Sequence, residues 1–196
     1  MLKKRVILIT GTPCVGKTSV SRLLAPKLDA EYVNLTDLAI HEHLTAGKDK
    51  ERGSTIVDEN KMRRKLSDLI ESGKKRNVII DGHYAVSVVP EDLVSHVFVL
   101  RRDPVELKKS MLSSAFTGCK LWENLASEIL DVCLVDALNV HGGGEVCELD
   151  VSGKNVEEIV KEILAVLEGR KKCCVGIVDW LGKLESEGVL DDYLKI

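Results

Sequence analysis

A glycine-rich segment near the N-terminus constrains the fold of this chain more than any other feature. Residues 11–18 read GTPCVGKT and satisfy the pattern G-x-x-x-x-G-K-[S/T], in which backbone amides surround a phosphate group. The preceding residues 5–10 (RVILIT) form a short β-branched apolar run, typical of a strand buried on both faces of a parallel sheet. Apolar residues then recur at helical spacing over 17–28. The sequence therefore predicts a strand, a phosphate-binding loop and a helix in succession.

The rest of the chain continues this alternation of strands and helices. Further apolar runs predict buried strands at 31–34, 77–81, 96–100 and 145–149. Helical stretches lie between them, around 58–73, 104–113, 121–139 and 155–168. Strands that alternate with helices predict an α/β fold with a parallel sheet. With 196 residues, of which 44% are hydrophobic, the chain is long enough to bury one sizeable core.

Lys17 and Thr18 end the glycine-rich segment, and the motif predicts a ligand-binding role for each side chain. The loop amides and the start of the following helix favour an anion, because unsatisfied N–H groups and the helix dipole both place positive partial charge there. Lys17 would reach the β- and γ-phosphates of a nucleotide, and the Thr18 hydroxyl would bind Mg²⁺. The alternative is a structural strand-to-helix turn with an exposed lysine.

Asp81 ends a second apolar strand at 77–81, and His83 follows two residues later. The carboxyl ends of parallel strands meet at one edge of the sheet, so Asp81 is expected beside the glycine-rich loop, where it would bind Mg²⁺ or orient a water on it. His83 could reach the γ-phosphate or an attacking water, and imidazole suits this work because it titrates near neutral pH. The alternative is an Asp-Gly turn followed by a surface histidine.

Other segments could belong to a site or only to the surface. Residues 45–57 and 113–120 look longer or more polar than the fold needs, and they are predicted to be mobile flaps or plain surface loops. His41 and His43 do not share a helix face, and we interpret them as surface residues. The three glycines of 141–145 (HGGGE) predict a loose turn before a strand.

Charge and cysteine content exclude some classes of protein. The chain carries 28 basic and 31 acidic residues, a net charge of −3, which argues against binding nucleic acid through bulk positive charge. The N-terminal apolar run is too short for a signal peptide or a membrane span, so a soluble, cytoplasmic protein is expected. The six cysteines have irregular spacings, which favours free thiols over a disulfide framework or a zinc site, while the adjacent Cys173 and Cys174 leave a metal or redox role open.

Five sequence blocks carry a resemblance to a known family. They are GTPCVGKT (11–18), YVNLTDLA (32–39), VIIDGH (78–83), FVLR (98–101) and RKKCCVGIVDW (170–180). Over about residues 1–180 the chain resembles the archaeal adenylate kinase-like family related to adenylate kinase isoenzyme 6. The D-x-H of Asp81 and His83 matches that family and replaces the D-G-F-P-R of ordinary adenylate kinases.

The resemblance implies a fold and a division of the chain. The fold is that of P-loop nucleoside monophosphate (NMP) kinases, with three layers built on a central five-stranded parallel sheet that has helices on both faces. One domain would span residues 1–180, with an NMP-binding segment at about 34–57 and a lid at about 113–120. Residues 181–196 would form an acidic C-terminal extension.

The resemblance also assigns residues to the site. It implies that ATP is bound by Cys14, Gly16, Lys17, Thr18 and Ser19, and that Lys154 lies on the base side. Ser114 stands where relatives place a triphosphate-binding arginine, so slow kinase turnover is expected. Lys108, Lys109, Lys120 or Arg102 could substitute for that cation, although a lysine lacks the bidentate geometry of a guanidinium.

The implied function is phosphoryl transfer from Mg·ATP to a nucleoside monophosphate such as AMP, together with ATP hydrolysis. The family further implies transient binding to a platform ribosomal protein of the small subunit and to the maturing particle, during late rRNA processing. An ATP-dependent conformational switch with little kinase activity is the alternative. A GTPase fits less well because the sequence has no NKxD string to read guanine. A shikimate-type kinase would need an acid-binding set of arginines that this sequence does not offer.

Overall fold

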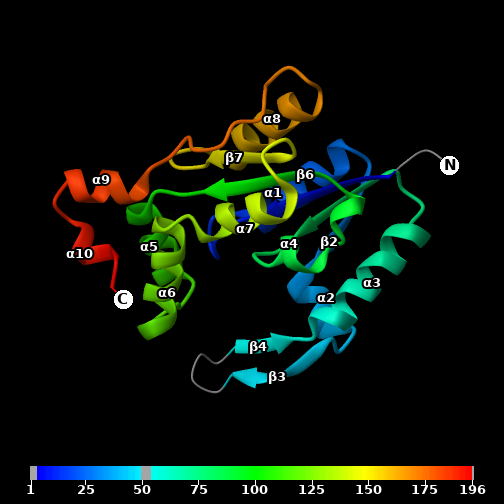
Figure 1. Ribbon diagram of the computed structural model, residues 1–196, viewed down its shortest axis with the longest axis horizontal. Helices are drawn as coiled ribbons and strands as arrows, with labels where there is room; N and C mark the ends of the chain where they lie inside the picture. The colour runs from blue at the N-terminus through cyan, green and yellow to red at the C-terminus, as the bar shows by residue number, and fades with distance from the viewer. Residues whose placement is uncertain (1–3, 50–53, 196) are drawn as a thin grey trace.

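A five-stranded parallel sheet forms the centre of the computed structural model, which describes residues 4–49 and 54–195. Its strands are β1 (Arg5–Thr10), β2 (Ala30–Asn34), β5 (Asn77–Asp81), β6 (Val94–Arg101) and β7 (Val146–Asp150). They lie in the order β2-β5-β1-β6-β7, and every neighbouring pair is parallel (Figure 1). The predicted strands and the predicted fold class are confirmed.

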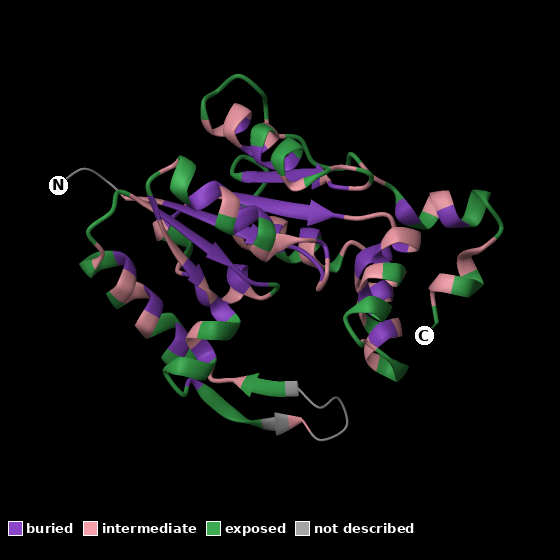
Figure 2. Ribbon diagram, turned by 180° about the vertical axis from the view of Figure 1, so that it is seen from behind, coloured by how far each residue is buried: buried purple, intermediate pink, exposed green. Residues whose placement is uncertain are grey.

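Helices cover both faces of this sheet, which gives the predicted three layers (Figure 2). They are α1 (Lys17–Lys27), α2 (Leu35–His41), α3 (Glu59–Ser72), α4 (Ala85–Val88), α5 (Pro104–Ser113), α6 (Gly118–Ile129), α7 (Val132–His141), α8 (Val156–Leu167), α9 (Trp180–Ser186) and α10 (Leu190–Tyr193). A 3₁₀ turn (Glu91–Leu93) precedes β6. Buried residues of α3, α4 and α7 pack on one face of the sheet, whereas those of α1, α5, α6 and α8 pack on the other.

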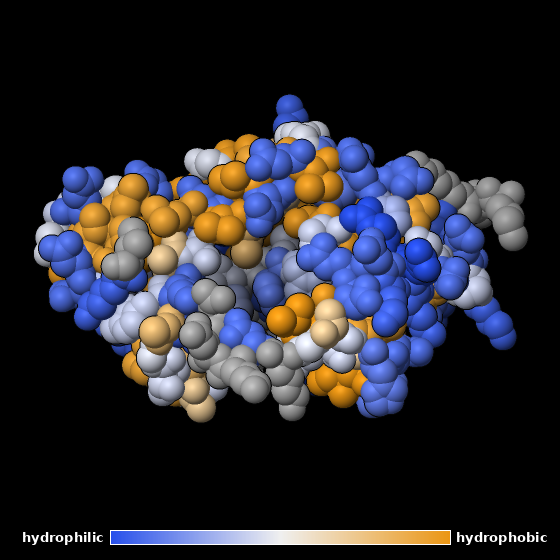
Figure 3. All heavy atoms as spheres, turned by 60° about the horizontal axis from the view of Figure 1, so that its bottom comes forward, coloured by the Kyte–Doolittle hydropathy of each residue, from blue (hydrophilic) through white to orange (hydrophobic). Residues whose placement is uncertain are grey.

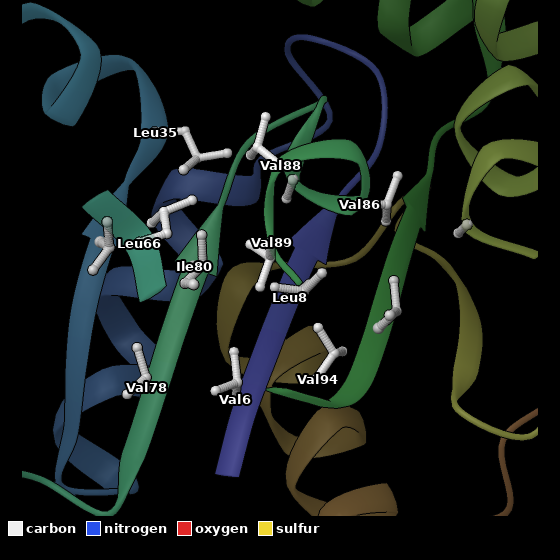
Figure 4. Close-up of a cluster of buried hydrophobic side chains, with 14 of the residues drawn as sticks. Val6, Leu8, Leu35, Leu66, Val78, Ile80, Val86, Val88, Val89 and Val94 are labelled. Carbon is white, nitrogen blue, oxygen red and sulfur yellow. The ribbon is translucent and has the colours of Figure 1, made fainter. Parts of the chain in front are cut away.

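The central strand β1 shows why the apolar runs are continuous. Val6 and Leu8 point to the face covered by α3 and α4, where Figure 4 shows them beside Val78 and Ile80. Their neighbours Ile7 and Ile9 belong to the core on the opposite face. All four β1 side chains are fully buried, because a strand in the middle of a covered parallel sheet has no solvent-facing side.

The helix expected over 121–139 is instead two helices, α6 and α7, separated by Leu130 and Asp131. Asp131 has a φ of 58°, and its carboxylate forms an ion pair with Arg101. The Arg101 guanidinium also donates to the Glu128 carbonyl oxygen at 2.9 Å. Hydrophobic periodicity could not predict this break, because its cause is an arginine on β6.

The two predicted flaps have more regular structure than expected. Residues 45–57 contain an antiparallel hairpin of β3 (Thr45–Asp49) and β4 (Ser54–Val57), whose tip at 50–53 lies outside the described residues. The predicted lid at 113–120 consists of the last residue of α5, a short connection at 114–117 and the first turn of α6. His41 and His43 are exposed, as predicted. The HGGGE segment forms the predicted turn, which follows α7.

Cys147 and Cys173 form a disulfide, which differs from the expectation that free thiols are favoured over disulfides. Their Cα atoms lie 4.7 Å apart although 26 residues separate them in sequence. The chain after α8 returns along β7, where the Glu148 amide donates to the Cys174 carbonyl at 2.9 Å, and this brings the two cysteines together. Cys14, Cys119, Cys133 and Cys174 are free. Among the described residues, no helix has the length and apolar character needed to cross a membrane.

Candidate active site

The loop between β1 and α1 has a backbone suited to binding an anion. Gly11 has a φ of 130°, and a Cβ atom there would lie 2.4 Å from the Leu100 carbonyl oxygen on β6. Gly16 precedes α1 with a φ of 103°, and within the described chain no side chain caps the amides of the first helical turn. These amides and the helix dipole favour a phosphate group. The donors present therefore fit the phosphates of a nucleotide.

The Lys17 side chain lies in this loop. Its ammonium group donates to the carbonyl oxygens of Gly11 at 2.7 Å and Thr12 at 2.9 Å. Burial lowers the pKa of Lys17, while the nearby Asp81 opposes this shift. The side chain is half-buried rather than exposed, so the alternative of an exposed turn lysine does not describe it.

Asp81 ends β5 at the same edge of the sheet and is 1% exposed. Its carboxylate accepts hydrogen bonds from Asn34 Nδ2 at 2.6 Å and Tyr32 Oη at 2.7 Å, both on the neighbouring strand β2. Burial raises the pKa of Asp81, and hydrogen bonds from Tyr32, Thr18 and Asn34 counteract part of the shift. Burial and the bond to Asp81 raise the pKa of Tyr32 to about 12.

Thr18 and Asp81 together fit a magnesium ion. The Thr18 hydroxyl is within hydrogen-bonding reach of Asp81, and Asn34 Nδ2 lies 3.4 Å from the Thr18 oxygen. Among the described residues no cluster of three or more metal-ligating side chains was found. Magnesium at nucleotide sites needs only one or two protein ligands, since phosphates and water complete its shell. The Thr18 hydroxyl and the Asp81 carboxylate are therefore enough protein ligands for a magnesium ion at a nucleotide site.

His83 lies beyond Asp81, in the wall of a cleft. His83 is an exposed residue, as a surface histidine would be, and desolvation by the cleft wall together with the positive charges of Lys17 and Lys120 lowers its pKa to about 4. The imidazole is therefore neutral at physiological pH, which corrects the expectation that it titrates near neutrality. A neutral imidazole can accept a hydrogen bond from a water or hydroxyl group.

This cleft, of about 660 Å³, lies between the β3–β4 hairpin and α6. Its lining consists of Pro13, Thr36, Thr55, Ile56, Val57, Glu59, His83, Tyr84, Phe116, Lys120, Glu123 and Asn124. Figure 3 looks onto this side of the molecule, with the hairpin and the α5–α6 pair toward the viewer. A second hollow of about 380 Å³ shares the wall formed by Pro13, His83, Tyr84 and Asn124 and extends toward α7. The arrangement offers space for an acceptor molecule beside the phosphate-binding loop.

The remaining predicted binding residues lie in four different places. Cys14 belongs to the loop and has a φ of 70°, a conformation that favours glycine. Ser19 is exposed on α1, and Ser114 is exposed at the end of α5, outside the lining of the cleft. Lys154 lies in the β7–α8 turn, where its ammonium is paired with Glu162 at 2.6 Å. The ATP-binding roles of these four residues stay predictions.

Two of the suggested substitute cations lie close to the loop or the cleft. Arg102 Nη1 donates to the Cys14 carbonyl at 3.3 Å, so its guanidinium lies against the phosphate-binding loop. Lys120 lines the cleft near His83. Lys108 lies over the rings of Trp122 and Tyr193 and does not line the cleft. Arg102 and Lys120 are therefore the better candidates for the missing lid arginine.

Sequence reasoning missed Tyr32 and Asn34 as partners of Asp81. Asn34 is the last residue of β2 and pairs in register with Asp81 on β5. The signal was present, because two predicted parallel strands each end in a polar residue. It could be used only by assuming that β2 and β5 are adjacent, which the sequence did not show.

Comparisons with known proteins agree with this geometry. A family model described as "AAA domain" matches residues 7–131. The chain is 40% identical over 176 residues to a "Putative adenylate kinase" of Pyrococcus furiosus, covering 89% of this chain and 91% of the relative. It is 33% identical over 177 residues to a protein of the same name from Methanocaldococcus jannaschii, covering 90% and 93% of the two chains.

Solved structures show the same fold at low sequence identity. Shikimate kinase from Acinetobacter baumannii in complex with shikimate matches with a TM-score of 0.61 and 15% identity, over 87% of this chain and 96% of that chain. Thymidylate kinase from Candida albicans matches with a TM-score of 0.55 and 16% identity, over 86% and 92%. The fold is therefore that of P-loop kinases. Because sequence matches at 31–40% identity cover most of both chains, this protein belongs to the family of archaeal adenylate kinase-like P-loop proteins.

Proposed function

We propose that this chain transfers the γ-phosphoryl group of Mg·ATP to AMP or another nucleoside monophosphate, and that it also hydrolyses ATP. The observation that supports this most is the convergence of Lys17, Asp81 and His83 beside a cleft large enough for an acceptor. The names of the archaeal relatives point to the same reaction class.

Each residue has a proposed role that follows from its surroundings. The loop amides and Lys17 bind the phosphate oxygens, where positive charge is the main catalytic resource in phosphoryl transfer. Magnesium held by Thr18 and Asp81 supplies further neutralisation of phosphate charge. His83, neutral because of its lowered pKa, accepts a hydrogen bond from the attacking group.

The cleft beside His83 suits a nucleoside monophosphate as acceptor. Ile56, Val57 and Phe116 supply apolar surface for a base, while Thr36 and Thr55 supply hydroxyl groups. Lys120 brings positive charge to the same cleft, which favours a phosphate group. A lysine in place of a lid arginine lacks the bidentate geometry of a guanidinium, which predicts slow transfer rather than weak ATP binding.

A direct assay tests this proposal. ATP is incubated with the protein alone and with AMP, GMP, CMP or UMP, and ADP and phosphate are quantified for the wild type and for Lys17→Ala. ADP formation that depends on a monophosphate and on Lys17 is the expected result. Phosphate release without any monophosphate dependence would favour the ATP-dependent switch. No nucleotide turnover in a folded wild type would overturn the proposal.

A role in maturation of the small ribosomal subunit is proposed on the family resemblance. Residues 177–196 carry five acidic and two basic side chains, and such a surface suits a basic partner, here a platform ribosomal protein. The test is binding of the purified ribosomal protein to this chain with and without ATP. Nucleotide-sensitive binding is expected, and no binding in either state would contradict the role.

A further inference from the structure

A cluster of buried charges lies behind the phosphate-binding loop, outside the residues assigned to catalysis. Arg101 and Glu128 are each 1% exposed, and Glu148 is 2% exposed. Arg101 donates from Nε to Glu128 at 2.9 Å and from Nη1 to Glu148 at 2.7 Å. Burying such charges is costly unless every partner is satisfied, so the cluster calls for an explanation beyond stability.

Glu128 uses its two carboxylate oxygens for different purposes. Oε1 accepts from Arg101 Nε, from the Arg102 amide at 3.0 Å and from Trp180 Nε1 at 3.1 Å. Oε2 accepts from the Thr12 hydroxyl at 2.6 Å. Oε1 is therefore fixed by residues outside the loop, while Oε2 binds Thr12 of the phosphate-binding loop.

Thr12 connects this carboxylate to the catalytic lysine. Its hydroxyl binds Glu128, and its carbonyl oxygen accepts from Lys17 Nζ at 2.9 Å. Arg102, whose amide also binds Glu128, extends its guanidinium to the Cys14 carbonyl in the same loop. The Glu128 carboxylate thus contacts both Thr12, which belongs to the loop, and Arg102, whose guanidinium binds the loop.

The chain beyond α8 completes the arrangement. It is joined to β7 by the Cys147–Cys173 disulfide and by the Ile177 amide, which donates to Glu148 Oε2 at 2.8 Å. It then places Trp180, 7% exposed, at the start of α9 with its indole N–H on Glu128. Residues 52 positions apart in sequence therefore meet behind the loop.

We infer that Glu128 is a positioning residue that sets the phosphate-binding loop through Thr12, and that Trp180 holds Glu128 in place. The inference rests on the proposed nucleotide site at this loop. Small displacements of groups that contact a reacting phosphate lower the rate strongly, because transfer depends on alignment. Loss of the contact should therefore lower kcat more than it weakens nucleotide binding.

Two variants test the inference, one by removing the carboxylate charge and one by removing the hydrogen bond that holds the carboxylate. Glu128→Gln keeps the shape but removes the charge, whereas Trp180→Phe keeps a buried ring and removes only the indole N–H. Trp122→Phe is the matched control, because the Trp122 ring on α6 packs against the ammonium groups of Lys108 and Lys195. For each variant we would measure the kcat and KM of phosphoryl transfer, the Kd of Mg·ADP by calorimetry, and the melting temperature.

We expect kcat to fall at least tenfold in Glu128→Gln and about threefold in Trp180→Phe, with a smaller rise in the Kd of Mg·ADP in each. Adding Trp180→Phe to Glu128→Gln should cause no further loss of kcat, because both act through one carboxylate. Trp122→Phe should match the wild type. If Glu128→Gln fails to fold, Trp180→Phe decides the question alone.

Several outcomes would overturn the inference. Lower melting temperatures with unchanged kcat and Kd would assign Glu128 and Trp180 a structural role only. An equal loss in Trp122→Phe would make the effect non-specific. A wild type that binds Mg·ADP but transfers no phosphoryl group would refute the proposed kinase instead, and the Kd values of Trp180→Phe and wild type would still decide the inference.

Discussion

Lys17, Asp81 and His83 owe their electrostatic properties to the neighbours that the fold supplies. Burial lowers the pKa of Lys17 and raises that of Asp81, whereas partial desolvation and the charges of Lys17 and Lys120 lower the pKa of the exposed His83. A magnesium ion and a polyphosphate would bring compensating charges to Asp81 and Lys17. The site is therefore organised to gain stability when both ligands bind together.

At Lys17, truncation should separate activity from folding. Lys17→Ala removes the charge beside the phosphates, so turnover should be lost, whereas the melting temperature should change little because the side chain packs in a loop and not in the core. Lys27→Ala, at the exposed far end of α1, is the control and should keep both properties. Wild-type turnover in folded Lys17→Ala would refute the role of the loop.

At Asp81, removal of the charge should change the metal requirement. Asp81→Asn retains the side-chain volume and one oxygen but loses the negative charge that attracts Mg²⁺. The Mg²⁺ concentration for half-maximal turnover should rise by roughly tenfold or more, which corresponds to ~1.4 kcal/mol. Titration of Mg²⁺ at saturating ATP measures this. An unchanged midpoint would remove Asp81 from the metal site.

At His83, the lowered pKa makes a prediction about pH. The folded-state value of about 4 lies below the ordinary 6.5, so the imidazole is already neutral at pH 6. The kcat/KM of ATP hydrolysis should stay flat from about pH 6 to 8 and fall as the pH approaches 4, since protonation removes the acceptor. His83→Gln should lower hydrolysis, spare ATP binding and lose this part of the profile. A wild-type inflection near 6.5 would contradict the depressed value.

The helices α5 and α6 are joined to the C-terminal helices α9 and α10 by side-chain contacts. Lys108 on α5 lies 4.8 Å from the ring of Trp122 on α6 and 4.6 Å from that of Tyr193 on α10. Lys183 on α9 forms an ion pair with Asp103, the residue before α5. Figure 1 shows α9 and α10 beside α5 and α6. These contacts attach the predicted acidic extension at 181–196 through Lys183 and Tyr193, and not through its acidic side chains.

Within this element, Lys120 is expected to supply the cation that Ser114 lacks. Lys120→Met should lower phosphoryl transfer to AMP roughly tenfold with little change in the Kd of ATP, because the loop supplies most ground-state binding. Lys109→Met, on an exposed position of α5, should leave transfer unchanged. Ser114→Arg should then add little. A tenfold gain in Ser114→Arg would instead show that the arginine position is vacant and matters.

At the scale of the whole molecule, the apolar core and the proposed acceptor cleft lie in different parts. The sheet and its covering helices contain the buried apolar side chains, among them Phe98, which is fully buried. The β3–β4 hairpin projects from this body, and its Ile56 is 50% exposed while lining the cleft (Figure 2). Substitutions in the core should therefore lower stability, whereas substitutions in the hairpin should weaken binding of the acceptor.

Phe98→Ala and Ile56→Ala test this separation. Phe98→Ala leaves a cavity in the core and should destabilise the protein by about 3–5 kcal/mol, which lowers the melting temperature by roughly 10 °C. Ile56→Ala should keep the melting temperature within a few degrees but raise the KM for the monophosphate acceptor. Thermal unfolding and steady-state kinetics of both variants measure this. A large loss of stability in Ile56→Ala would show that the hairpin belongs to the core.

The local pattern of the chain determined the α/β class, the five strands, the glycine-rich loop and the likeness to the adenylate kinase-like family. Such features depend on periodicity and on short motifs, which neighbouring residues carry by themselves. Lys17, Thr18, Asp81 and His83 could be named for the same reason, because each follows or lies within a recognisable strand end or loop. Tyr32 and Asn34 could be recognised as partners of Asp81 only once the structure showed that β2 pairs with β5.

Only the tertiary structure decided the features that depend on distant residues. The break between α6 and α7 and the carboxylate behind Thr12 both arise where Arg101 meets Glu128, 27 residues away. The pairing of Cys147 with Cys173 requires the chain to return along β7. The pKa of His83 falls because folding removes water and brings Lys17 and Lys120 near. Solvation and charge at a site are set by residues that are neighbours in space, and sequence spacing does not contain that information.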